Sequence, residues 1–170
     1  AEGSINASIT NNGIIDAGLS NTIDKLVING DYTSSPESTT IVTTDFDPAV
    51  DEIVVTGHAN ASGAIAVNVV DPGAAMPGNH SSVILHAAGG LTNNGATLQA
   101  PQSAVVKFSL ANNAMDMMLN YVVNFAPEGM TKNQNALGNT VNSIQLFQQS
   151  PLYPAFKPIA SALLLSLIHI

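Results

Sequence analysis

Four carboxylates stand close together in the chain and could bind a divalent cation: Asp45, Asp47, Asp51 and Glu52. Oxygen ligands at this density suit calcium, but the spacing lacks the glycine turn and the closing glutamate of a calcium-binding loop. We therefore interpret this segment as a solvated turn between two strands. The sequence predicts no metal site.

Three histidines could include a general base or a metal ligand: His58, His80 and His86. The chain has no cysteine and no His-x-x-x-His pair, so a zinc site is not indicated. We expect these histidines at exposed or edge positions. A Ser-His-Asp site can be assembled from distant residues, but there is no Gly-x-Ser-x-Gly elbow. With no phosphate loop and no dinucleotide fingerprint either, we assign no catalytic residue and no cofactor.

Positive charge is scarce. Arginine is absent, the lysines are Lys25, Lys107, Lys132 and Lys157, and the formal net charge is −8. This balance argues against binding nucleic-acid phosphates and against anionic membrane surfaces. Polysaccharide lyases and hydrolases built on β-helices are the enzymatic alternative, but they need a cation beside their carboxylates. The scattered lysines do not favour that activity.

The elements that would position these side chains are short strands. From about 23 to 125 the apolar residues recur with a period of two, as in Leu26 and Ile28, or Ile53 and Val55. The clearest example places Leu119, Tyr121, Val123 and Phe125 on one face. Gly, Pro, Asn and Asp separate the strands, and the methionines Met115, Met117 and Met118 are interpreted as core filler. This pattern favours an all-β body, either a β-sandwich or a β-helix.

The pattern changes after Pro127. From Thr131 to about Gln149 the apolar residues Leu137, Val141 and Ile144 are spaced as on one face of a helix. Thr131 suits the N-cap, and Pro151 ends the helix. A second helix is predicted over residues 155–164. Residues 165–170 read like one translated frame of a sequencing adapter, and we exclude them from fold reasoning.

Three segments resemble the C-terminal part of autotransporter passenger domains. They are DKLVINGDYT (24–33), DEIVVTGHANASGAIAVNVVDPG (51–73) and LNYVVNFAPEGMTKNQNALGNTVNSIQ (119–145). They follow one another in the family's order and cover most of the chain. The resemblance implies an all-β fold, a right-handed parallel β-helix, over residues 1–130. It also implies a helical linker over 131–164 that leads toward a β-barrel translocator not contained in the chain.

The same resemblance implies a location at the cell surface or outside the cell, tethered to the outer membrane of a Gram-negative bacterium. The implied partners are the protein's own barrel and upstream β-helix coils, with host ligands bound by upstream regions. We therefore predict a structural segment, not an enzyme, in which residues 104–125 cap the strands and nucleate folding. The alternative is an adhesion module with its own ligand, on a β-helix or a β-sandwich.

Overall fold

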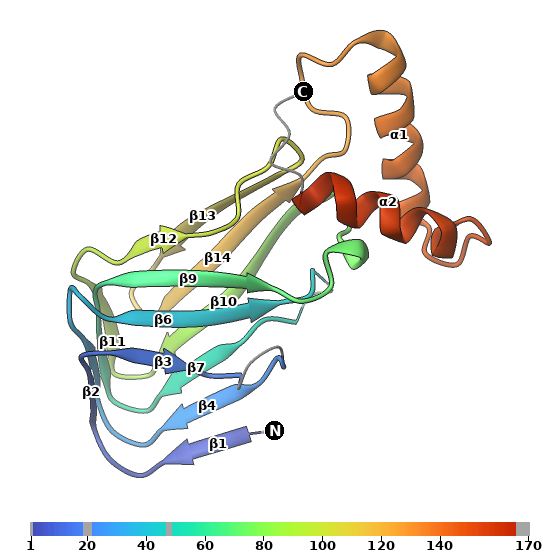
Figure 1. Ribbon diagram of the computed structural model, residues 1–170. Helices are drawn as coiled ribbons and strands as arrows, with labels where there is room; N and C mark the ends of the chain where they lie inside the picture. The colour runs from blue at the N-terminus through green and yellow to red at the C-terminus, as the bar shows by residue number, and fades with distance from the viewer. Residues whose placement is uncertain (1, 19–21, 47–48, 166–170) are drawn as a thin grey trace.

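The computed structural model describes residues 2–18, 22–46 and 49–165, and three β-sheets form the body of this part of the chain (Figure 1). The first sheet contains, in spatial order, β1 (Glu2–Ile5), β4 (Lys25–Ile28), β7 (Glu52–Val55), β10 (Gly78–Ala87), β14 (Asp116–Val123) and β13 (Val106–Asn112). The second contains β11 (Gly90–Asn93), β8 (His58–Ala61), β5 (Tyr32–Ser34) and β2 (Ile9–Asn11). The third contains β12 (Thr97–Gln99), β9 (Ala64–Val69), β6 (Thr39–Thr44) and β3 (Ile14–Asp16).

The chain visits the three sheets in rotation. Each strand from β1 to β9 pairs in parallel with the third strand after it, so that the series ends at β12. Ile28, Val55 and Ala87 are therefore aligned across β4, β7 and β10, and all three are fully buried. Alternate residues of a strand point to opposite faces. This register therefore directs every second, apolar side chain of each strand into a shared interior.

The last two strands break the rotation. β13 pairs antiparallel with β14, and β14 pairs antiparallel with β10. Only residues 113–115 separate β13 from β14, and so short a link permits only an antiparallel pair. The side-chain oxygen of Asn113 accepts hydrogen bonds from the N–H groups of Met115 and Asp116, which fixes the turn.

The predicted alternation along β14 is confirmed. Leu119, Tyr121, Val123 and Phe125 are all buried. Phe46 lies edge-on to Tyr121 with the ring centroids 5.2 Å apart, and Phe108 lies 5.8 Å from the same ring. This aromatic cluster fills the core beneath the β13–β14 hairpin with geometry that aromatic pairs prefer.

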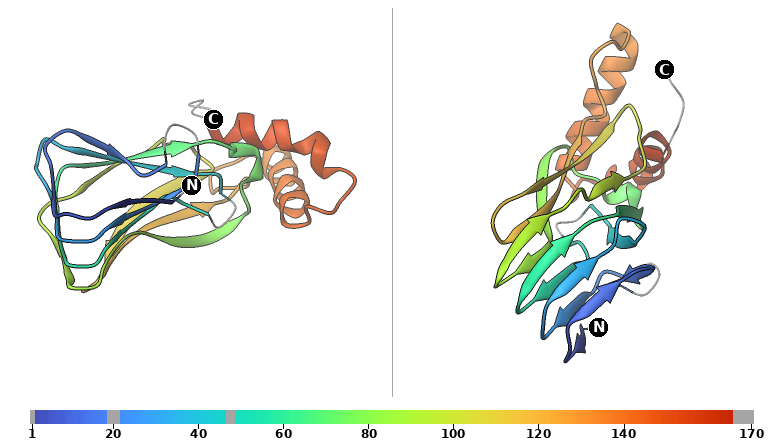
Figure 2. Two further views of the ribbon diagram at one scale, coloured as in Figure 1. Left: turned by 90° about the horizontal axis from the view of Figure 1, so that it is seen from below. Right: turned by 90° about the vertical axis from the view of Figure 1, so that its left-hand side faces the viewer.

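Both predicted helices are confirmed. α1 spans Lys132–Leu146 and α2 spans Tyr153–Leu165, and they lie together at one end of the sheets (Figures 1 and 2). Thr131 is the N-cap of α1 and forms a capping box with Gln134. Val141 and Ile144 are buried as expected, but Leu137 is 54% exposed.

The buried face of α1 is rotated from the predicted one by a backbone contact. Gly138 lies against the carbonyl of Phe125, so closely that a Cβ atom would collide with it. α2 packs on the short 3-10 helix η1 (Pro72–Ala74), and Lys157 forms a 2.6 Å ion pair with Asp71. None of the described helices is both long enough and apolar enough to cross a bilayer.

The expected fold class, an all-β right-handed parallel β-helix, is wrong. The described part of the chain is mixed α/β, with three mostly parallel sheets and two α-helices, and it forms no closed solenoid. The period-two pattern identified the strands, but it does not show that β14 and β13 pair antiparallel, which ends the parallel stack. The proposed adapter segment 165–170 lies outside the described residues, apart from the backbone of Leu165 in α2.

Candidate functional site

The acidic group does not converge on a common site. Asp51 is 1% exposed and accepts hydrogen bonds from the backbone N–H groups of Asp24 (2.8 Å) and Thr43 (2.7 Å). Burial raises the pKa of the Asp51 carboxyl, and the negative charge of Asp16 raises it further. The interpretation of this residue as part of a solvated turn is therefore wrong. Its side chain joins the start of β4 to β6 inside the protein.

The neighbouring carboxylate points the other way. Glu52 is the first residue of β7 and forms a 2.9 Å ion pair with Lys25 on the adjacent strand β4. Asp47 lies outside the described residues. In the part of the chain that the structure describes, no group of three His, Asp or Glu side chains could hold a metal ion.

The histidines occupy three different environments. His58 is exposed on β8, as predicted. His80 stacks on Tyr121 with the ring centroids 4.8 Å apart, and its Nε2 lies 2.8 Å from the carbonyl oxygen of Met76. His86 lies half-buried where β10 pairs with both β7 and β14, so the expected exposed or edge position is wrong for it. His80 is half-buried where β10 pairs with β14 alone, which agrees with an edge position.

His86 is paired with a carboxylate. Its Nδ1 lies 2.6 Å from Oδ1 of Asp116, the residue opposite it on β14. The hydrogen bond from His86 lowers the pKa of the Asp116 carboxyl, and a second one from Asn113 lowers it further. This pair joins β10, the last strand of the first sheet to have a parallel partner, to β14, the second strand of the antiparallel hairpin.

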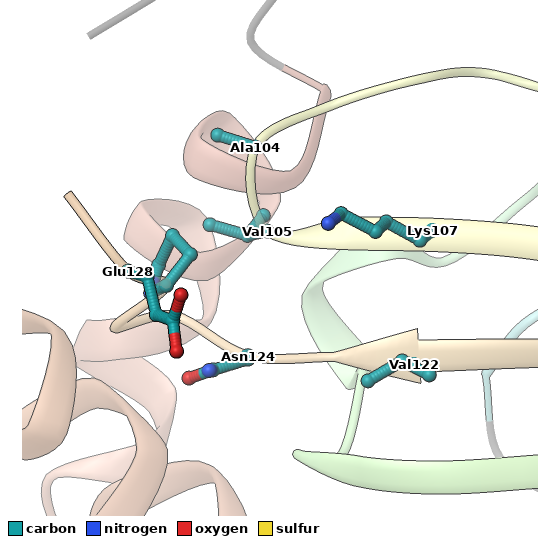
Figure 3. A pocket seen from close by; sticks show the side chains of 7 residues that line it. Ala104, Val105, Lys107, Val122, Asn124 and Glu128 are labelled. Carbon is teal, nitrogen blue, oxygen red and sulfur yellow. The ribbon is translucent and has the colours of Figure 1, made fainter.

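A hollow of about 430 Å³ opens on the outer side of the hairpin, near the start of β13 and the end of β14. Val105 and Val122 supply apolar walls, and Lys107, Asn124 and Glu128 supply polar groups (Figure 3). One ammonium and one carboxylate line it, whereas the usual glycoside-hydrolysing sites use two carboxylates. The lining does not form that constellation.

The more informative geometry lies at the two ends of the stacked strands. At one end, the β13–β14 turn covers the edge of β11, because the N–H of Leu91 donates to the carbonyl of Ala114 at 2.8 Å. Met117 is fully buried beneath this turn, as expected of core filler, whereas Met115 is 41% exposed and is not. We call this region, residues 104–125, the closing hairpin.

At the opposite end the described strands are open. β1, β2 and β3 each pair with a described strand on one side only. Ile9 and Ile15 are only partly buried there, and Ile14 is 73% exposed. We call these three strands the open end, because an edge strand presents backbone N–H and C=O groups that can pair with a further strand.

Sequence reasoning proposed residues 104–125 as a cap from their Phe, Met and Tyr content, but it predicted neither their antiparallel hairpin, nor the open end, nor the His86–Asp116 pair. No local pattern marks any of these features, because each depends on which strands become neighbours. Comparison of the chain with protein-family models, with curated proteins and with solved structures gave no match.

Proposed function

We propose that this chain is a structural and folding-template segment from the C-terminal part of an autotransporter passenger, displayed at or released from the surface of a Gram-negative bacterium. Its proposed partners are strands that stack on the open end and the translocator barrel of the same protein. One observation carries the proposal: one end of the strand stack is closed by an antiparallel hairpin, and the other end offers three parallel strands for pairing.

The difference between the ends gives a direction to assembly. Parallel strands three apart in the sequence bury their apolar face only when a neighbouring layer is already present. The closing hairpin needs no such layer on its outer side, because its two strands are close in the sequence and pair with each other. It can therefore form early and serve as the surface on which β10, and then the earlier strands, are laid down.

The burial of the core is consistent with this direction. Next to the closing hairpin, Leu119 and Met117 are fully buried, and the aromatic cluster around Tyr121 lies in the same region. At the open end the apolar side chains of Ile9 and Ile15 are only partly covered. Stability is expected to decrease from the hairpin toward the open end, because fewer apolar groups are buried there.

The adhesion alternative receives less support. The aromatic side chains that the sequence offers for a binding patch include Tyr32, Phe46 and Tyr121, and all three are buried in the core. The enzymatic alternative would need clustered carboxylates, but Asp51 and Glu52 point to opposite sides of β7 and engage different partners. We therefore propose a non-catalytic role.

Two matched core variants test the folding direction. Leu119→Ala removes a fully buried side chain from β14, and Ile28→Ala removes one from β4. Each is expected to destabilise the protein by about 2 to 5 kcal/mol. If the hairpin forms first, Leu119→Ala slows refolding, whereas Ile28→Ala mainly accelerates unfolding.

Stopped-flow refolding and unfolding of both variants measure how each loss of stability divides between the two rates. Pulse-labelled hydrogen exchange tests the order of folding independently. Amides of β13 and β14 are expected to become protected before those of β1 to β3. A refolding rate that Ile28→Ala lowers more than Leu119→Ala does, or earlier protection at the open end, contradicts the proposal.

A further inference from the structure

Charge is segregated along the chain. Residues 1–128 contain all twelve Asp and Glu residues and two of the four lysines, a formal net charge of −10. Residues 129–170 contain no Asp or Glu and carry Lys132 and Lys157, a formal net charge of +2. The formal net charge of −8 for the whole chain is the sum of these two values of opposite sign. The objection to membrane surfaces from the total charge therefore applies to the strand body, and not to the helical part.

The connection between α1 and α2 exposes apolar side chains. We call residues 146–153 the helical tip; within it Leu146 is 57% exposed, Phe147 61% and Leu152 53%. Both figures show this connection projecting away from the sheets, at the far side of the helices (Figures 1 and 2). Its polar residues are the uncharged Gln148, Gln149 and Ser150.

The backbone of the helical tip forms local hydrogen bonds. The N–H of Phe147 donates to the carbonyl of Ile144, that of Ser150 to Phe147, and that of Tyr153 to Ser150. The N–H of Leu152 donates to the hydroxyl of Ser150. Such internal pairing lowers the cost of moving the segment out of water, because unpaired backbone groups are costly in an apolar phase.

We propose that the helical tip binds the surface of a lipid bilayer, with Phe147 and Leu152 inserted at the boundary between headgroups and acyl chains. Exposed apolar side chains without neighbouring carboxylates suit that boundary, and Tyr153 adds an aromatic ring with a polar end. Residues 129–165 place no negative charge beside the lipid headgroups. This binding goes beyond the proposed structural role and does not require it.

A single tryptophan can report on insertion, because the chain contains none. We would prepare Phe147→Trp and record its emission with and without phosphatidylcholine vesicles. A blue shift, together with quenching by brominated acyl chains, is expected. Ile14→Trp is the matched control, because Ile14 is 73% exposed at the open end of the strand body. Its emission is expected to stay unchanged.

Charged substitutions at the helical tip test the binding without removing apolar area. The double substitution Gln148→Glu and Gln149→Glu is expected to weaken vesicle co-sedimentation about tenfold, because carboxylates resist entry into the interface. Phe147→Ser combined with Leu152→Ser is expected to weaken it by a similar factor or more, because apolar burial is lost. Leu137→Ser, at another exposed apolar position of α1, is expected to bind as the wild type does.

Two results would overturn the proposal. One is an emission of the Phe147→Trp variant that vesicles do not shift, or that shifts equally for the Ile14→Trp control. The other is a blue shift that depends on protein concentration without lipid, since the helical tip would then bind a second copy of the chain. Circular dichroism of each variant verifies that it is folded. The refolding experiments contain no lipid, so failure of one proposal is distinguishable from failure of the other.

Discussion

Nδ1 of His86 lies 2.6 Å from Oδ1 of Asp116, and this pair links the parallel strands to the antiparallel hairpin that closes them. The two residues face each other across β10 and β14, on the outer side of the sheet. Other charged groups on this side include Glu52 on β7, next to β10, its partner Lys25 on β4, and Lys107 on β13. The pair therefore lies where the sheet changes from parallel pairing, between β7 and β10, to antiparallel pairing, between β10 and β14.

The first prediction concerns this link and pH. Because the hydrogen bond from His86 lowers the pKa of Asp116, the folded protein binds a proton at this carboxyl less readily than the unfolded chain does. The stabilisation is therefore present above the unfolded pKa of about 3.9, and it is lost as pH falls through the lowered folded pKa. We expect Asp116→Asn to lower the melting temperature at neutral pH, and the difference to shrink in strong acid.

Thermal melts of the two proteins across that pH range measure the effect. Glu128→Gln, at an exposed position of the outer hollow, is the control and is expected to melt like the wild type at neutral pH. A difference between Asp116→Asn and the wild type that stays constant down to the lowest pH would show that the pair does not stabilise the fold electrostatically.

The second prediction concerns Asp51, whose two carboxylate oxygens accept the N–H groups of Asp24 and Thr43. Asp51→Ala leaves both donors without that acceptor, so we expect a loss of about 3 kcal/mol of unfolding free energy below the unfolded pKa of about 3.9. The sign of the pH dependence is opposite to that of Asp116. Because burial raises the pKa of Asp51, its contribution is full below the unfolded pKa and declines as pH rises through the folded one.

Urea denaturation of wild type and Asp51→Ala at several pH values checks this sign. The difference in unfolding free energy should decrease as pH rises from below the unfolded pKa of about 3.9 to neutral pH. An increase over the same range would mean that the two backbone hydrogen bonds outweigh the cost of burying the charge, and that the pKa of Asp51 is lowered in the folded protein.

A third prediction concerns the packing of α1 against the strand body at Gly138. Gly138→Ala places a methyl group against the carbonyl of Phe125, and the backbone on both sides must then shift. We expect a loss of about 1 to 3 kcal/mol in stability, although alanine favours an isolated helix over glycine by about 1 kcal/mol. Asn133→Ala, at an exposed position of the same helix, is the control. A Gly138→Ala variant as stable as the wild type would show that α1 is not seated this closely.

The fourth prediction concerns the start of α1. The hydroxyl of Thr131 accepts the N–H of Gln134, and the side-chain oxygen of Gln134 accepts the N–H of Thr131. Thr131→Ala removes the first of these bonds, so we expect a loss of about 1 kcal/mol. Thr131→Ser should retain most of the stability, and chemical denaturation of the three proteins measures the difference. Equal losses for Ala and Ser would point to packing of the threonine methyl group instead.

Much of the local structure is predictable from the residues themselves. The period of two along residues 119–125 predicts both a strand and its buried face, because side chains of a strand alternate by geometry. Thr131 predicts a helix start, because an N-cap hydroxyl bonds to backbone groups only two or three residues away. Such features depend on residues that are close in the chain, so they can be predicted without knowledge of the fold.

The tertiary structure decided everything that depends on distant neighbours. The burial of Asp51, the pairing of His86 with Asp116 across thirty residues, and the exposure of Leu137 follow from which strands and helices become adjacent. Strand periodicity is the same for parallel and antiparallel pairing, so the order of the sheets and the turn to an antiparallel end are absent from the local pattern. The sequence alone determined the strands, the helices and the segregation of charge; only packing in three dimensions determined which end of the stack is closed.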